Sequence, residues 1–323
     1  MIRQKEFSPP PGLRGPNIQS ILASARFRAA GAHPVFRNSV EKILETTRGV
    51  RLQGFYSENQ DRKGLVLLLH GWEGSAQSTY IRSTARFLFD HGYSVFRLNL
   101  RDHGDSHHLN RGLFFGTLFD EVFEAADQAG QMAEGGPFFA VGFSLGGNYA
   151  LRIAREASRR PISQLRRVVA VSPVLNPARA TEVVDRTFLY RRYFMKKWKR
   201  SLLRKQQAYP ELYDFSEVLS CNKIMGLTAA LLSKYSPYKD PYQYFRGYTL
   251  VGDALLHVNV PTTIITSKDD PIIPVDDFYG LCLSPPTELL IQSYGGHNGF
   301  IENYRLCAWY ERGLCELFSL DGG

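Results

Sequence analysis

The stretch Gly142-Phe143-Ser144-Leu145-Gly146 constrains the fold of this 323-residue chain more than any other feature. Residues 138–141 before it are apolar and predict a buried strand, and residues 148–154 after it predict a helix. A serine at the tip of so tight a strand–turn–helix unit needs small residues two positions away on either side, and the two glycines meet that demand. The turn exposes the Ser144 hydroxyl, and the helix N-terminus then points its N–H groups at any negative charge that develops there.

The same five-residue pattern also occurs in ordinary turns, so its weight depends on partners further along the chain. A serine hydroxyl is a weak nucleophile, and it needs a histidine base that is held in place by an acid. In a strand–turn–helix nucleophile site, the acid and the histidine both follow the serine in the sequence.

Candidates for both partners occur in that order. Residues 260–266 are apolar and β-branched and predict a strand, and Asp269 and Asp270 follow it. We expect Asp270 to be the catalytic acid, with Asp269 as the alternative; the other aspartate would only shape a turn or cap a helix. After a further strand at 288–292, His297 stands between glycines, and we expect it to be the catalytic base.

A second pattern predicts where the oxyanion of such a reaction is stabilised. Residues 65–69 read Leu-Val-Leu-Leu-Leu and predict a buried strand that ends in His70-Gly71. We expect the N–H groups of Trp72 and Leu145 to form the oxyanion hole. The simpler interpretation of His70-Gly71 is an ordinary strand exit.

Strands alternate with helices along most of the chain, which predicts an α/β fold with a mostly parallel sheet flanked by helices. We expect residues 1–172 to form the first part of the core, with an extended N-terminal arm at 1–39 that residues 18–22 dock. Residues 173–259 break the alternation and predict a helical cap inserted into the core. Residues 260–323 then complete the core and carry the acid and the base.

The basic charge is concentrated in the predicted cap. The chain has a net charge of +8 and a pI of about 9.3. Residues 186–205 contain nine Lys or Arg and no acid, with aromatic side chains between them. This segment predicts either a helix in peripheral contact with an anionic membrane or a solvated helix whose aromatic side chains face the core. Nucleic acid is not an expected partner, because no binding motif accompanies the charge.

The remaining composition favours an intracellular, cofactor-free protein. The start of the chain, residues 1–6, is polar and has no apolar run after it, so we expect a cytoplasmic protein, with membrane association as an alternative. Residues 135–151 lack charges but are rich in glycine and do not predict a membrane span. Cys221, Cys282, Cys307 and Cys315 lack metal-site spacing and predict reduced core residues. The sequence makes no prediction about the oligomeric state.

One polar segment has two interpretations. Residues 99–106 follow a predicted strand and read Asn-Leu-Arg-Asp-His-Gly-Asp-Ser. Arg101 and Asp102 are expected to brace this turn through side-chain hydrogen bonds. The alternative is that the segment contacts substrate.

Together these residues resemble the YheT-like branch of the α/β-hydrolases across nearly the whole chain. The motifs that carry the resemblance are 70–75 (HGWEGS), 80–82 (YIR), 99–106 (NLRDHGDS), 141–148 (VGFSLGGN), 171–173 (VSP), 269–271 (DDP), 296–300 (GHNGF), and the cap segments 208–210 (AYP) and 242–245 (YQYF). The chain departs from the family pattern at Asn17, where a histidine is usual nearby, and at Trp72, where leucine is usual. Trp72 is expected to narrow the acyl pocket.

The resemblance implies a serine hydrolase of carboxylic esters with short or medium acyl chains, including monoacylglycerols. Its catalytic residues would be Ser144, Asp270 and His297, and its partner a small ester or lipid, with no metal or cofactor. A thioesterase or amidase would use the same residues. A different class is a non-catalytic protein that binds lipid or membrane on the same fold.

Overall fold

A computed structural model describes residues 6–321, so the first five residues of the predicted arm and the last two of the chain lie outside the described part. Eight strands form one sheet in the order β1-β2-β4-β3-β5-β6-β7-β8. The strands are β1 (Val40–Glu45), β2 (Arg51–Ser57), β3 (Leu65–Leu69), β4 (Ser94–Leu98), β5 (Phe138–Phe143), β6 (Leu165–Val171), β7 (Thr262–Ser267) and β8 (Thr287–Gln292). β2 pairs antiparallel with both of its neighbours, and every pair from β4 to β8 is parallel. The predicted mostly parallel α/β fold is therefore confirmed.

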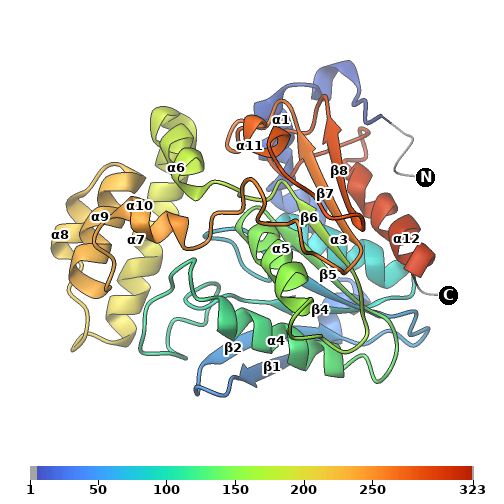
Figure 1. Ribbon diagram of the computed structural model, residues 1–323, viewed down its shortest axis with the longest axis horizontal. Coiled ribbons are helices and arrows are strands. Elements are labelled where there is room, and N and C mark those ends of the chain that lie inside the picture. Colours follow the sequence, from blue (N-terminus) through green and yellow to red (C-terminus); the bar gives the residue numbers. More distant parts are fainter. Residues whose placement is uncertain (1–5, 322–323) are drawn as a thin grey trace.

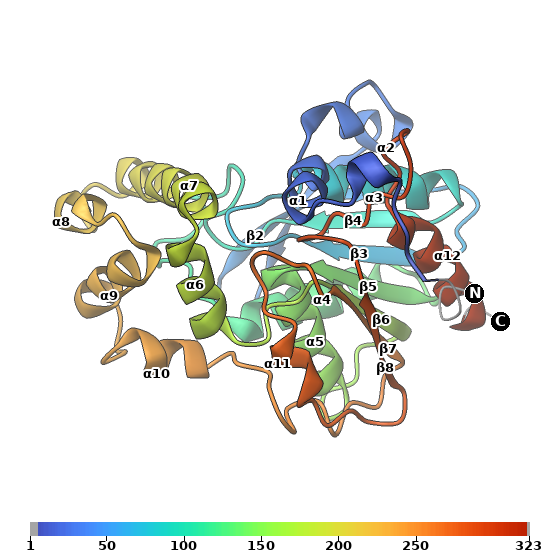
Figure 2. The same cartoon turned by 90° about the horizontal axis from the view of Figure 1, so that it is seen from above.

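Helices cover both faces of this sheet. Those of the core are η2 (Pro11–Leu13), α1 (Pro16–Ala23), η3 (Arg26–Ala29), α2 (Pro34–Arg37), α3 (Thr79–Asp90), α4 (Phe119–Gln131), α5 (Leu145–Ala157), α11 (Asp276–Tyr279) and α12 (Trp309–Asp321). Figure 2 shows α3 and α12 on one face of the sheet and α4 and α5 on the other.

The sequence of β3 shows why the sheet is covered on both sides. Leu65, Leu67 and Leu69 pack in the core cluster that includes α4 and α5. Val66 and Leu68 pack in the second cluster, with α3 and α12. A strand that is buried on both faces has a continuous run of apolar residues, whereas a strand with one solvent-exposed face alternates apolar and polar residues.

Between β6 and β7 the chain forms a group of helices beside the sheet instead of a single crossover helix (Figure 1). These helices are α6 (Pro177–Arg186), α7 (Phe188–Ala208), α8 (Ser216–Ser220), α9 (Ile224–Tyr235) and α10 (Pro241–Arg246). We call them the cap. They fall within the segment in which the sequence predicted a helical insertion, and in Figure 1 they project to one side of the sheet.

The N-terminal arm differs from its prediction. It is not extended, because Pro11 and Pro16 occupy the first positions of η2 and α1, where a fixed backbone angle favours a helix start. Ile18 and Ile21 are exposed, and the buried residues of α1 are Gln19 and Ala23. The amide group of Gln19 bonds the carbonyl of Leu13 at 2.6 Å and both main-chain groups of Ile301, so a polar side chain docks the arm.

The prediction of reduced core cysteines holds only in part. All four are free thiols, and Cys221 and Cys315 are partly buried against the core, but Cys282 and Cys307 are exposed. Cysteine is a small side chain, so the sequence pattern around it carries little information on burial.

One buried ion pair connects the cap to the core. Lys205 of α7 donates to the carboxylate of Asp102, in the loop after β4, at 2.8 Å, and both side chains are buried. The same ammonium group donates to the carbonyls of Asn110 at 2.5 Å and Gly112 at 2.9 Å. The predicted bracing role of Asp102 is therefore seen, and Arg101 pairs with Glu121.

We expect Lys205→Met to lower the free energy of unfolding by about 3–5 kcal/mol, because it leaves the Asp102 carboxylate buried without its cation. Lys196→Met, at an exposed position of the same helix, is the matched control and should change stability by less than about 0.5 kcal/mol. Urea unfolding followed by fluorescence measures both. Equal stability of the two variants would contradict the assignment of Lys205 as an anchor of the cap.

Candidate active site

Ser144 lies at the turn between β5 and α5 with a φ of 55°, a conformation that is strained for a residue other than glycine. The chain crosses itself closely there. A Cβ atom on Gly142 would lie 2.0 Å from the carbonyl oxygen of Gly146, and one on Gly146 would lie 2.2 Å from the carbonyl oxygen of Leu69. The two glycines are therefore required for the turn, as the sequence pattern predicted.

His297 and Asp270 are brought together from the loops after β8 and β7. The Nδ1 atom of His297 lies 2.9 Å from Oδ2 of Asp270, whose side chain is fully buried. The other carboxylate oxygen accepts the N–H groups of Ile272 and Ile273 at 2.8 and 2.9 Å. These bonds fix the carboxylate and leave Nε2 as the ring nitrogen of His297 that faces away from the acid.

The two aspartates of the loop do different work. Oδ1 of Asp269 accepts the main-chain N–H of Gly296 at 2.9 Å, one residue before His297. Asp269 thus holds the histidine loop, while Asp270 contacts the imidazole. The sequence analysis expected Asp270 to be the acid, and Asp270 is the aspartate that contacts His297.

Ser144 and His297 line the same cavity. Among residues 6–321, no hydrogen bond joins Ser144 Oγ to His297 Nε2. Such bonds are often long in a ligand-free site and tighten when substrate binds.

Helix α1 supports the histidine loop from outside, a role that the sequence analysis missed. The main-chain N–H of His297 donates to Oγ of Ser20 at 2.8 Å. Gly296 adopts a φ of 52°, and a Cβ atom there would lie 2.4 Å from the carbonyl oxygen of Pro16. One turn earlier on α1, Asn17 accepts a hydrogen bond from Tyr190 of the cap at 2.7 Å. The only sequence feature that singled out this part of α1 was the departure from the family pattern at Asn17.

The predicted oxyanion loop packs directly against the serine. A Cβ atom on Gly71 would lie 3.0 Å from Cβ of Ser144. The Gly71 carbonyl accepts bonds from Nδ1 of His70 at 2.8 Å and from the N–H of Gly74 at 2.9 Å. Because the Gly71–Trp72 peptide is trans, the N–H of Trp72 points the opposite way from that carbonyl. Leu145 begins α5, where helix N–H groups have no partner within the helix.

His70 keeps this peptide in place as a neutral ring. Its Nε2 accepts the N–H of Leu100 at 3.1 Å, so the proton is on Nδ1, which donates to the Gly71 carbonyl. Burial, and to a lesser extent the neighbouring His103, hold the pKa of His70 well below its usual range. The ring therefore has one donor and one acceptor, and both are used.

Ser144, His297, Leu145 and Trp72 line one cavity of about 870 Å³ between the core and the cap. Asp270 lies behind His297, outside the lining. Apolar side chains from the cap and neighbouring loops form much of the wall: Val184, Leu231, Leu232, Phe245, Ile272 and Ile273. Among residues 6–321, no group of three His, Cys, Asp or Glu side chains is placed to hold a metal ion.

The Trp72 indole packs against the cap. It stacks on Phe194 with ring centroids 5.4 Å apart, and its edge meets Trp198 at 5.0 Å. Both partners belong to α7, so aromatic residues of the basic segment face inward at this point.

A family model and related sequences identify the family of this chain. The model of the alpha/beta hydrolase family matches residues 66–308. A monoacylglycerol lipase of Saccharomyces cerevisiae is 22% identical over 278 residues, which cover 81% of this chain and 60% of the relative. Phospholipase ABHD3 of Mus musculus is 21% identical over 268 residues, which cover 80% and 64%. The chain thus spans less than two thirds of the length of these relatives.

A solved structure supports the fold. An esterase of Pyrococcus furiosus superposes with a TM-score of 0.56 at 16% identity, covering 91% of this chain and 98% of the esterase. At that identity the likeness concerns the fold alone.

We expect Gly146→Ala to abolish folding or to lower the free energy of unfolding by about 3 kcal/mol, because the new methyl group overlaps the Leu69 carbonyl oxygen. Gly226→Ala is the matched control: it lies in α9 with nothing within 4 Å of the added methyl, and it should stabilise by about 0.5–1 kcal/mol. Thermal unfolding and soluble yield measure both. A Gly146→Ala protein as stable as the parent would contradict the close crossing at Ser144.

Proposed function

Since this chain belongs to the alpha/beta hydrolase family, we propose that it is a serine hydrolase that cleaves carboxylic esters through an acyl-enzyme on Ser144. The observation that carries the proposal is the contact between His297 and Asp270 beside a serine held on a strained turn. The narrower resemblance to the YheT-like branch stays a prediction.

Each residue has a distinct role in the proposed reaction. His297 takes the proton of the Ser144 hydroxyl as the oxygen attacks the ester carbonyl, and returns it to the departing alcohol. Water then attacks the acyl-enzyme by the same route and releases the acid. Asp270 keeps the imidazole in the correct tautomer and stabilises its charged form. The N–H groups of Trp72 and Leu145 stabilise the oxyanion, and each such donor contributes about 2.7–4 kcal/mol.

The cavity supports acyl esters as the substrate class. Its apolar cap wall offers a place for a hydrocarbon chain of short or medium length, since burial of each methylene group contributes about 0.8 kcal/mol. The names of the two relatives, a monoacylglycerol lipase and a phospholipase, favour a lipid ester.

We expect Ser144→Ala and His297→Ala each to lower kcat on p-nitrophenyl octanoate by roughly four to six orders of magnitude. The double variant should lose no more than either single one, because the two residues act as a unit. Asp270→Asn should lose roughly 10⁴-fold through the wrong tautomer. Steady-state kinetics on purified proteins of equal thermal stability measures these losses.

Asp269→Asn is the matched control in the same loop. Its Oδ1 atom can still accept the Gly296 N–H, so it should cost far less activity than Asp270→Asn. The opposite order would make Asp269 the acid. Near-normal rates in Ser144→Ala would contradict the proposed acyl-enzyme.

We also propose that the mouth of the cavity contacts an anionic lipid surface. Exposed apolar side chains of the arm and the cap lie there: Ile21 is 56% exposed, Leu189 52% and Tyr193 43%, and all three line the cavity. The hydrogen bond between Tyr190 and Asn17 joins the arm to the cap. No helix within residues 6–321 is long and apolar enough to cross a membrane.

The structure narrows which cations of residues 186–205 face such a surface. Arg191, Lys197, Lys199 and Lys205 donate to main-chain carbonyls of the protein itself. Arg192 and Lys196 are exposed.

Arg192→Gln/Lys196→Gln should weaken binding to phosphatidylglycerol vesicles roughly 30-fold at low salt, at about 1 kcal/mol per cation, and little at high salt. The control Arg48→Gln/Arg159→Gln removes two exposed arginines outside the cap, one between β1 and β2 and one after α5, and should change binding little. Vesicle co-sedimentation measures both. Binding of the parent protein that does not depend on the phosphatidylglycerol content would contradict the proposal.

A further inference from the structure

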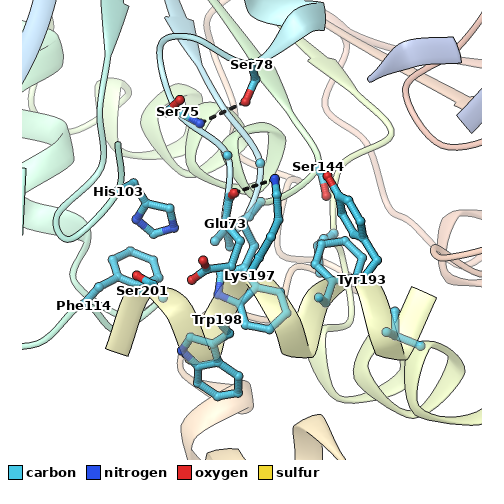
Figure 3. A pocket seen from close by; sticks show the side chains of 18 of the residues that line it. Glu73, Ser75, Ser78, His103, Phe114, Ser144, Tyr193, Lys197, Trp198 and Ser201 are labelled. Atoms are coloured by element: carbon cyan, nitrogen blue, oxygen red, sulfur yellow. Dashed lines mark hydrogen bonds between the residues drawn. The ribbon is translucent and has the colours of Figure 1, made fainter. Parts of the chain in front are cut away.

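The cavity has a polar end that the proposed ester chemistry leaves unused. Glu73 comes from the loop after β3, His103 from the loop after β4, and Lys197 from α7, and all three line the cavity. Figure 3 shows them around one space, with the Glu73 carboxyl group pointing toward α7. The two sequence motifs at 70–75 and 99–106 thus meet at one place.

His103 brings an unused hydrogen-bond acceptor to this end. Its Nδ1 atom donates to the carbonyl of Arg101 at 2.7 Å, which leaves the lone pair on Nε2. The residue is only 3% exposed, and its Nε2 has no partner among the described residues. Burial lowers the pKa of His103 to about 4, so the ring stays neutral near pH 7. A buried acceptor without a donor costs free energy, and a ligand hydroxyl would remove that cost.

Glu73 adds a second polar group that the catalytic residues do not use. It has a φ of 55°, which a non-glycine residue rarely adopts. Burial raises the pKa of its carboxyl group to about 8, against the opposing effect of Lys197 and Arg200. Near pH 7 the group is therefore largely protonated and offers both a donor and an acceptor. Lys197 binds the Glu73 carbonyl at 2.9 Å and has further N–H groups to donate.

We propose that Glu73, His103 and Lys197 form a subsite for the hydroxyl groups of a polyol leaving group, of which glycerol is the simplest. One hydroxyl donates to Nε2 of His103 and accepts from the Lys197 ammonium group, and a second exchanges hydrogen bonds with the Glu73 carboxyl. The subsite rests on the function proposed above and specifies its substrate as a polyol ester, such as a monoacylglycerol.

The subsite lies close enough to Ser144 to be reached by the alcohol part of a bound ester. Gly71 packs against Ser144, and Glu73 is two residues further along the loop, so its Cα lies within about 7.6 Å of the Gly71 Cα. That span is comparable with the reach from an ester oxygen to the far hydroxyl of glycerol.

The neutral His103 ring favours a neutral polyol over a phosphate group at this end. The lone pair on Nε2 of His103 repels a phosphate oxygen. Among the cations of the lining, Arg204 is paired with Asp105 and Lys197 donates to a carbonyl, while Arg200 is exposed.

The test compares two esters with one acyl chain, 1-monooctanoylglycerol and propyl octanoate, by kcat/KM. The parent protein should prefer the glycerol ester about tenfold or more, as two hydrogen bonds imply. Glu73→Leu and His103→Phe should each reduce that preference about fivefold while leaving propyl ester hydrolysis within threefold. Glu73→Gln keeps a donor and an acceptor and should retain the preference. Glu211→Gln, an exposed acid outside the lining, is the control.

Four outcomes would overturn the subsite. Equal kcat/KM for both esters in the parent protein would show that the protein does not recognise the glycerol hydroxyls, although it hydrolyses esters. Equal losses on both esters in Glu73→Leu and His103→Phe show a structural role only. Preference for octanoyl glycerol phosphate over 1-monooctanoylglycerol, lost in Lys197→Met, identifies a phosphate site instead. Hydrolysis of neither ester contradicts the proposed function itself and the subsite with it.

Discussion

The contact between the start of α5 and the ends of β3 and β5 is the constraint on which the rest of this site depends. At Gly142 and Gly146 the backbones approach so closely that no side chain fits. The approach forces Ser144 into a strained conformation and places its Cβ against Gly71 of the loop that follows β3. One packing event therefore positions the serine, the first turn of α5 and the Trp72 peptide together. Strain of this kind persists only where the surrounding structure over-determines it, and here buried strands on both sides do so.

The histidine depends on a second set of contacts, made by segments far apart in the sequence. Asp269 and Asp270 hold its loop and its ring from one side, and Ser20 of α1 holds its main chain from the other. Because α1 also bonds the cap through Asn17, the arm connects the base to the cavity wall. The cap is in turn fixed to the core through Lys205. The cap is thus attached to the rest of the protein at two separate points, Tyr190 and Lys205, and a movement that opens the cavity has to displace it.

Sequence patterns predicted what short-range chemistry determines. The continuous apolar run of β3 and the two glycines around Ser144 each require one local structure. The mostly parallel sheet was predicted from the alternation of strands with helices along the chain. The patterns failed where a long-range contact decides the outcome. Gln19 is buried because it bonds Ile301, more than 280 residues away, and nothing in its own segment shows this. The same holds for Ser20. The sequence favoured Asp270 as the acid, but it did not show that Asp269 holds the histidine loop. His103 looked like one of several polar loop residues, and only the burial of its Nε2 distinguishes it.

The central claim is that these contacts make Ser144 an activated nucleophile. Covalent labelling with a fluorophosphonate, followed by mass mapping of the peptides, tests it most directly. The account predicts an adduct on Ser144 in the parent protein and its loss in His297→Ala, because the serine reacts only when the histidine accepts its proton. An absence of label on Ser144 from mildly acidic to basic pH, or equal labelling in His297→Ala, would contradict it.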